Sequence, residues 1–403
     1  MGLMKLGIDE LLQNPLHRKP LEGRRIALLG HAASVTSECR HTLDALMDCP
    51  EVQVVSAFGP QHGMRGDKQD NMIETDNYVD PRHNVPVFSL YGNVRRPTER
   101  MMETFDVLLV DLQDIGTRTY TYVTTLTYAL EACAEHGKSI WILDRPNPIG
   151  RPIEGTILED GWESFVGVAS LIMRHGLTLA ELARWFVARS GLDVDLHVVR
   201  MTDYRPEAGP GYGWPVLELS WVNPSPNASS LNMARCFPGT VLFEGTTLSE
   251  GRGTTMPLEV VGAPDIDFDL ILSRMRSLAP QWLAGCCLRQ CYFEPTFHKH
   301  VGKMCSGIQI HTDNASYRHE QFRPYRLAAL ILKAVRLEYS DYELWRRFPY
   351  EYETERLAFD LLSGGTFLRS WVDNPSAGPS DLDERLRKDE QEWLQIRKPF
   401  LLY

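Results

Sequence analysis

The chain has 403 residues, of which 43% are hydrophobic and 24% charged, so it is long enough for two hydrophobic cores. Lys and Arg number 42 against 53 Asp and Glu, which gives a formal net charge of −11. This excess of acidic residues argues against a nucleic-acid partner or an anionic membrane surface. A neutral or locally recognised small ligand fits the composition better.

The N-terminal segment predicts a cytoplasmic protein. "MGLMKLGIDELLQNPLHRKP" carries charged and polar residues where a secretory signal needs an unbroken apolar stretch, and no window reaches the ~18 apolar residues of a membrane span. The eight cysteines form no CxxC pair and no regular framework, as is typical of reduced thiols. The oligomeric state is left open.

The first half of the chain alternates short apolar runs with helical patterns. Five runs that end in turn residues predict buried strands, at 24–31, 51–60, 85–92, 106–114 and 139–148. Helical patterns lie between them, the strongest at 121–137, and the capping-box pair Thr178 and Glu181 opens a further predicted helix before a strand at 193–201. This alternation predicts an α/β fold with a mostly parallel, doubly wound sheet.

The hydrophobic period is lost between 209 and 255, where Gly, Pro, Ser and Thr dominate. We interpret this region as a long functional loop or an interdomain seam. Beyond it, strands alternate less regularly with helices, which predicts a smaller α+β domain. We therefore expect residues 1–250 to form the N-terminal catalytic domain, and 251–403 to form a C-terminal domain that completes the cleft.

Polar side chains follow three of the predicted strands. In an open parallel sheet, ligands bind beyond the carboxyl ends of the strands, because loops and helix N-termini converge there. A solvated edge or a helix cap explains any single such residue, but three consecutive polar strand ends favour a binding site. The residues are Gln61, His62, Arg65, Asp67, Asp70 and Glu74 after the second strand, Asp111, Gln113, Asp114, Arg118, Tyr120 and Tyr122 after the fourth, and Asp144, Arg145 and Asn147 after the fifth.

Several common sites are not expected. The turn after the first predicted strand lacks GxGxxG, and no GxxxxGK[ST] occurs, so neither NAD nor ATP is predicted as a cofactor. "HKHVGKMC", from His298 to Cys305, has no acidic or cysteine partner at ligand spacing, so no metal is predicted. A GxSxG elbow is also missing, which weakens a serine-hydrolase interpretation.

Carboxylates beside aromatic and arginine side chains favour a glycoside hydrolase. Glu244, Glu250 and Glu259 surround "FEGTTLSEGRGTTMPLE" together with Arg252, and tyrosines and tryptophans are available as apolar platforms. In such enzymes one acid protonates the leaving oxygen while a second group stabilises or attacks an oxocarbenium-like centre.

Taken together, the motifs resemble one family, the exo-acting β-N-acetylmuramidases of the NamZ type. The resemblance spans nearly the whole chain and rests on "FGPQHGMRG", "VPVFSLYGNVRRPT", "DVLLVDLQDIGTRTYTYVTTL", "WILDRPNPIG", "WVNPSPN", "FEGTTLSEGRGTT" and the terminal "PFLLY". It implies a Rossmann-like N-terminal domain, a second domain, and release of N-acetylmuramic acid from the non-reducing ends of peptidoglycan fragments.

The resemblance also implies which residues line the cleft. They are Gln61, His62, Arg65, Asp114, Arg118, Tyr120, Asp144, Asn223, Glu244, Glu250 and Arg252. The third position of GP-x-HG is glutamate in many family members, where it is the favoured catalytic acid, but here it is Gln61, and an amide cannot donate that proton. We expect Glu74 or Asp70, on the same loop, to replace it. Otherwise the substrate or the activity has changed.

Two further hypotheses concern recognition and mechanism. Arg65, Arg118 or Arg252 is expected to bind the lactyl carboxylate of a muramic acid, because a guanidinium suits that group. Asp114 is expected to hold the acetamido N–H of a sugar that assists its own hydrolysis, although Asp111 could take that place with Asp114 capping the next helix. Gln61 also leaves open a sugar-binding homologue without turnover, or a hydrolase of another acidic glycoside.

Overall fold

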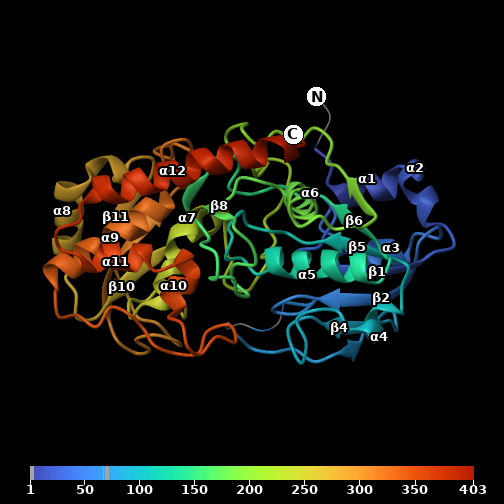
Figure 1. The fold of residues 1–403 in the computed structure, drawn as a ribbon, viewed down its shortest axis with the longest axis horizontal. Helices are drawn as coiled ribbons and strands as arrows, with labels where there is room; N and C mark the ends of the chain where they lie inside the picture. The colour runs from blue at the N-terminus through green and yellow to red at the C-terminus, as the bar shows by residue number, and fades with distance from the viewer. Residues whose placement is uncertain (1–3, 67, 69–71) are drawn as a thin grey trace.

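The computed structural model describes residues 4–66, 68 and 72–403. Two sheets lie in opposite halves of the molecule, the N-terminal sheet on the right of Figure 1 and the C-terminal sheet on the left. Helix α12, Pro379–Arg397, runs along the top of this view from the C-terminal half towards the N-terminal half.

The N-terminal sheet has seven strands in the order β3-β4-β2-β1-β5-β6-β9. The strands are β1 Arg25–Gly30, β2 Gln53–Gly59, β3 Tyr78–Val79, β4 Pro86–Ser89, β5 Val107–Asp111, β6 Ser139–Leu143 and β9 Leu196–Val199. All pairings are parallel except that of β3 with β4. The chain order reverses direction between β1 and β5, which is where open α/β sheets bind ligands. The prediction of a doubly wound, mostly parallel sheet is confirmed.

Helices cover both faces of this sheet because each central strand is apolar on both sides. Ile26 and Leu28 of β1 belong to the core under α1 and α3, whereas Ala27 and Leu29 face the core under α4, α5 and α6. The helices are α1 Gly7–Gln13, α2 Pro15–Arg18, α3 Thr42–Met47, α4 Glu99–Met102, α5 Tyr122–Glu135 and α6 Leu179–Ser190. Helix α6 begins with the predicted capping box of Thr178 and Glu181.

The C-terminal half packs helices on a three-stranded antiparallel sheet, in the order β10-β12-β11, and so confirms the second, smaller α+β unit. The elements are β10 Val260–Ala263, β11 Cys287–Phe293, β12 Cys305–His311, α8 Phe268–Leu278, α9 Pro324–Glu338, α10 Ala358–Ser363 and α11 Phe367–Asp373. A two-stranded pair, β7 Glu154–Ile157 and β8 Ile172–Arg174, joins the halves. The domain boundary at 250 stays a prediction.

Residues 209–255 were interpreted as a long loop or an interdomain seam, and the first of these alternatives was wrong in part. Helix α7, Leu231–Thr240, and the 3₁₀ helix at Val241–Gly245 lie inside it. Nine of the ten α7 residues are buried, so no polar face marks the helical period, and Pro238 and Gly239 resemble loop signals.

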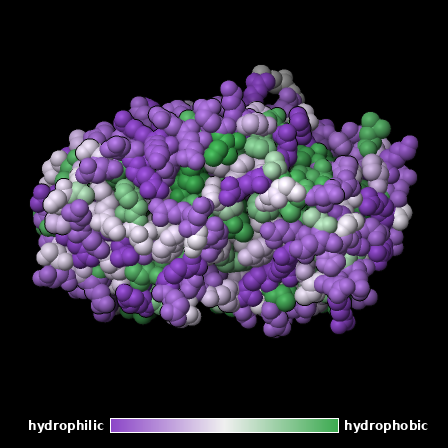
Figure 2. Space-filling view, in the orientation of Figure 1, coloured by the Kyte–Doolittle hydropathy of each residue, from purple (hydrophilic) through white to green (hydrophobic). Residues whose placement is uncertain are grey.

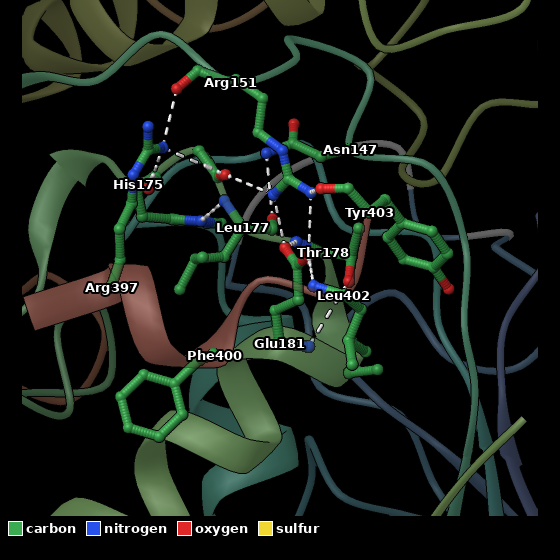
Figure 3. Close-up of polar contacts among 12 residues, drawn as sticks. Asn147, Arg151, His175, Leu177, Thr178, Glu181, Arg397, Phe400, Leu402 and Tyr403 are labelled. Carbon is green, nitrogen blue, oxygen red and sulfur yellow. Dashed lines mark hydrogen bonds and ion pairs between the residues drawn. The ribbon is translucent and has the colours of Figure 1, made fainter. Parts of the chain in front are cut away.

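The C-terminal segment ties the two halves together (Figure 3). Arg151 forms a buried double hydrogen bond with Glu181 of α6, and it also donates to the carbonyl oxygen of Tyr403. Arg397, at the end of α12, donates to the carbonyl of Arg151, while the N–H of Leu402 donates to Glu181. These contacts fix α12 against α6 and thereby the relative position of the two sheets.

The face shown in Figure 2 is largely hydrophilic, and its hydrophobic residues form small groups, as suits the net charge of −11. Within the described part of the chain, no helix is both long and apolar enough to cross a membrane.

Candidate active site

A narrow cleft lies between the two halves, at the carboxyl edge of the N-terminal sheet. The turn after β2, the segment before and into α5, and the loop 225–227 supply one wall, whereas α7, the 3₁₀ helix that follows it, and the chain after α9 supply the other. The polar lining residues are Gln61, His62, Thr119, Tyr120, Thr121, Tyr122, Ser225, Asn227, Glu244, Arg252, Tyr350 and Glu351.

Glu351 is the centre of a hydrogen-bond network in this cleft. Gln61 Nε2 donates to Glu351 Oε1 at 2.9 Å, and the Tyr91 hydroxyl donates to Glu351 Oε2 at 2.8 Å. The Thr121 hydroxyl donates to Gln61 Oε1 at 2.7 Å, which fixes the amide with its N–H towards the carboxylate. Gln61 therefore positions Glu351 and has no proton of its own to give to a leaving group.

Glu351 is 6% exposed, and burial raises its pKa from 4.5 to about 7. The hydrogen bonds from Tyr91 and Gln61 act in the opposite direction, and the nearby Glu244 adds to the increase. A carboxyl group with this pKa is protonated in a large fraction of molecules near neutral pH. It has the property required of a general acid.

A strained turn presents Glu351. Tyr350 and Glu353 exchange backbone hydrogen bonds of 2.9 Å in both directions, so Glu351 and Tyr352 are the two central residues of a tight hairpin turn. Both central residues have positive φ, 46° and 70°. Such turns favour Asn and Gly at these positions. A glutamate and a tyrosine there are strained, and strain of this kind gathers at functional sites.

A second carboxylate, Glu244, lies in the cleft within an ionic network. Its Oε1 accepts from Arg252 Nη2 at 2.6 Å and its Oε2 accepts from the Tyr350 hydroxyl at 2.7 Å. Behind Arg252, the buried Glu250 lies within 3.3 Å of Arg252 Nε and 2.7 Å of Lys299 Nζ. Burial alone would raise the pKa of Glu250, but Lys299 and Arg252 outweigh it and lower the pKa to about 2.

His31, directly after β1, attaches the loop at 224–227 to the sheet. The backbone N–H of Gln113 donates to His31 Nε2 at 2.9 Å, so Nδ1 carries the proton and donates to the carbonyl of Pro224 at 3.0 Å. Burial lowers the pKa of His31 to about 3, which keeps this neutral form. The Tyr122 hydroxyl donates to the same carbonyl. The arrangement fixes Ser225 and Asn227 in the cleft wall.

Of the cleft residues that the resemblance implies, the structure brings five into the cleft: Gln61, His62, Tyr120, Glu244 and Arg252. Glu250 supports Arg252 from behind. Arg65 and Glu74 line a separate hollow beside β4, where Arg65 pairs with Asp80 and Glu74 pairs with Arg95. Asp70 and Asp67 lie outside the described residues.

Three other predicted substrate-binding residues lie away from the cleft. Arg118 is buried, and its guanidinium donates to the carbonyls of Thr156, Leu171 and Leu362, so it holds the backbone together. Asp144, directly after β6, is buried and accepts from Tyr403 and from Thr178 at the start of α6. Asn223 is exposed and does not line the cleft. Each position follows a strand or loop as expected, but the side chain points elsewhere.

Asp114 accepts from the backbone N–H of Gly116 at 2.6 Å and lies 3.4 Å from His175 Nε2. It is buried beside the cleft without lining it. Asp111 binds Arg145 and the Thr42 hydroxyl, so both its oxygens are engaged. The proposed contact of Asp114 with a sugar acetamido group stays a prediction.

Glu351 was missed because it comes from the other half of the chain. The predicted site residues follow strands of the N-terminal sheet, whereas Glu351 lies in the turn between α9 and α10. The signal that was present is "PYEYE", residues 349–353, two glutamates interleaved with tyrosines. The rule of carboxylates beside aromatics, applied to the entire chain, would have found it.

Comparison with known proteins agrees with this architecture. The sequence matches the family described as exo-β-N-acetylmuramidase NamZ, its N-terminal part over residues 26–232 and its C-terminal part over residues 235–403. The chain belongs to the NamZ family. It is 36% identical over 402 residues to the peptidoglycan β-N-acetylmuramidase NamZ of Bacillus subtilis (strain 168), a match that covers 99% of this chain and 91% of the relative.

Two crystal structures from Bacteroides fragilis NCTC 9343, each described as a DUF1343 family protein, share the fold. One has a TM-score of 0.86 at 30% identity and covers 99% of each chain. The other has a TM-score of 0.76 at 27% identity and covers 100% of this chain and 99% of its own. The NamZ fold therefore extends over the full length of this protein, including both walls of the cleft.

Proposed function

We propose that this NamZ family member is an exo-β-N-acetylmuramidase that removes N-acetylmuramic acid from the non-reducing end of peptidoglycan fragments, with Glu351 as its general acid. The observation that carries the proposal is a buried carboxyl group with a raised pKa in the interdomain cleft of a chain that belongs to this glycosidase family. Glu351 thus replaces Glu74 and Asp70, which we predicted from the sequence as candidates for the general acid.

The geometry around Glu351 makes its proton available to a substrate. Gln61 and Tyr91 each donate to one carboxyl oxygen and accept nothing from it. A proton on Glu351 therefore lies on a remaining lone pair and can point to a glycosidic oxygen. A glutamate at position 61 would place two carboxyl groups within hydrogen-bond distance and make them share one proton. An amide there suits a single acid on the facing turn.

The reaction then needs one proton and one water molecule. Glu351 protonates the glycosidic oxygen, the bond from the anomeric carbon to that oxygen breaks with its electron pair going to the oxygen, and water adds to the anomeric carbon. The proton that the water loses restores Glu351 once the products leave. Glu244 supplies the negative charge that stabilises the oxocarbenium-like centre.

The function is tested with the disaccharide N-acetylmuramyl-β-1,4-N-acetylglucosamine. We expect free N-acetylmuramic acid and N-acetylglucosamine in equal amounts, measured by mass spectrometry. A longer glycan blocked at the 4-hydroxyl of its non-reducing end should resist an exo-acting enzyme. Cleavage inside the blocked glycan would contradict exo action, and binding without release would favour the second candidate, a sugar-binding homologue, for which Gln61 is the specific argument.

Arg252 is proposed to bind the lactyl carboxylate. Among the described residues that line the cleft it is the sole Lys or Arg, and its two ion pairs leave Nη1 unused. We expect Arg252→Lys to reduce the preference for N-acetylmuramic acid over N-acetylglucosamine as competitive inhibitors by about tenfold. If Arg252→Lys weakens the binding of both inhibitors equally, the substitution has only damaged the ionic network of Glu244 and Glu250. That result would contradict this role of Arg252.

The pKa of Glu351 predicts two effects of pH. A general acid must be protonated, so kcat/KM should fall as the pH rises through about 7. The pKa of Glu351 in the folded state also lies above the ordinary value of 4.5, so the unfolded chain loses this proton at a lower pH than the folded protein. The stability that the proton contributes is therefore lost as the pH rises from about 4.5 to about 7. Glu351→Gln should therefore raise the melting temperature more at pH 8 than at pH 5. An equal change at both would contradict the raised pKa.

We further propose a cytoplasmic role in cell-wall recycling. All eight cysteines are free thiols, which supports a reducing compartment. The substrate there would be a short imported peptidoglycan fragment, because a cytoplasmic enzyme meets few intact wall polymers. Fractionation of the native host with an antibody tests the compartment, and recovery of the protein outside the cytoplasm would overturn it.

A further inference from the structure

The turn that carries Glu351 also carries Tyr352, and the two side chains lie in opposite environments. Glu351 is buried in the cleft, whereas Tyr352 is 53% exposed directly beside it. The ring of Tyr352 lies 5.9 Å from the ring of Tyr91, whose hydroxyl binds Glu351. The exposed ring of Tyr352 is therefore linked to the Glu351 carboxyl group through Tyr91.

Tyr352 is exposed, yet its neighbours fix it. The guanidinium of Arg95 stacks on the ring with Cζ 3.4 Å from its centroid, and the Tyr352 hydroxyl donates to Glu74 Oε1 at 3.2 Å. Arg95 in turn donates to the same Glu74 oxygen at 3.0 Å. A ring held in this way loses little conformational entropy when a ligand packs on its open face.

The backbone conformation gives a second, independent reason to assign Tyr352 a role. Its φ of 70° strains a tyrosine and suits a glycine. Tyr352 is not part of the hydrophobic core, because the residue is 53% exposed. A residue that costs stability and packs no core is expected to serve the site.

We propose that Tyr352, supported by Arg95, is the platform for the leaving group, a hexopyranose ring whose C–H face stacks on the open side of the tyrosine. The inference rests on the proposed function, which places the scissile oxygen at Glu351. The released sugar then lies over Tyr352, the next residue of the turn. The muramyl ring then lies on the other side of Glu351, towards Tyr120 and Arg252. Met72 Sδ accepts from the backbone N–H of Glu351 in the same turn.

The test compares two substrates that differ only in the leaving group, the N-acetylmuramyl-N-acetylglucosamine disaccharide and methyl β-N-acetylmuramide. For Tyr352→Gly we expect the ratio of their kcat/KM values to fall about tenfold, because the methyl glycoside has no ring to stack. We also expect the melting temperature to rise, because Gly accepts the positive φ. Tyr352→Phe keeps the ring and should keep the ratio.

The results separate the two proposals. If the unmodified protein hydrolyses neither substrate, the proposed function fails. If it hydrolyses both and Tyr352→Gly leaves the ratio unchanged, the platform is wrong while the function stands. If Tyr352→Phe lowers the ratio of kcat/KM values as much as Tyr352→Gly does, the platform is also wrong. The hydroxyl rather than the ring would then carry the effect.

Discussion

Replacement of Glu351 by Gln is expected to lower kcat on the disaccharide by about 10²–10⁴-fold, the usual contribution of a general acid. The variant should fold, because the surrounding hydrogen bonds can be kept. Gln61 can turn its amide so that its oxygen accepts from the introduced amide, while its N–H donates to Thr121, whose hydroxyl both donates and accepts.

Glu355→Gln is the matched control for that experiment. Glu355 lies four residues further along the chain and is exposed, so the same substitution removes one charge near the turn without entering the cleft. Its rate should stay within about twofold of the unmodified protein, since surface substitutions have small effects. Glu74→Gln should likewise show far less than the loss in Glu351→Gln. A larger loss at Glu74 would return the acid to the loop that follows β2.

Replacement of Glu244 by Gln should lower kcat by about 10²–10³-fold, the usual cost of removing one preorganised electrostatic group. Gln keeps an acceptor for the Tyr350 hydroxyl or for Arg252 but removes the negative charge from the cleft. Because Glu244 does not protonate the leaving group, this loss should be the same for leaving groups that need a proton and those that do not. Steady-state kinetics with both kinds of substrate measure the two losses. A loss confined to substrates whose leaving group needs a proton would make Glu244 the general acid instead.

Much of the N-terminal half could be predicted from the sequence. Its strands are short apolar runs with turn residues at their ends, and parallel pairing follows from their alternation with helices. The capping box at Thr178 and Glu181 marked the start of α6. The prediction failed at α7, because a helix buried on all sides has no polar face to reveal its period.

The site was harder to predict because side-chain direction cannot be read from strand ends. Asp144 and Gln61 both follow strands of one sheet, yet Asp144 turns towards α6 and Tyr403, while Gln61 turns into the cleft. The contact of Gln61 with Glu351 joins positions 290 residues apart in the chain. A pairing so distant follows from how α12 and the C-terminal segment hold the two halves together, which no local pattern encodes.

The measurement that tests the central claim most directly is the activity of Glu351→Gln on a 2,4-dinitrophenyl β-N-acetylmuramide compared with the disaccharide. Dinitrophenolate departs as a stable anion and needs no proton, whereas a sugar alkoxide does. If Glu351 is the general acid, the loss of about 10²-fold or more on the disaccharide should shrink to within about tenfold on the dinitrophenyl substrate. An equal loss on both substrates would contradict the assignment of Glu351 as the proton donor.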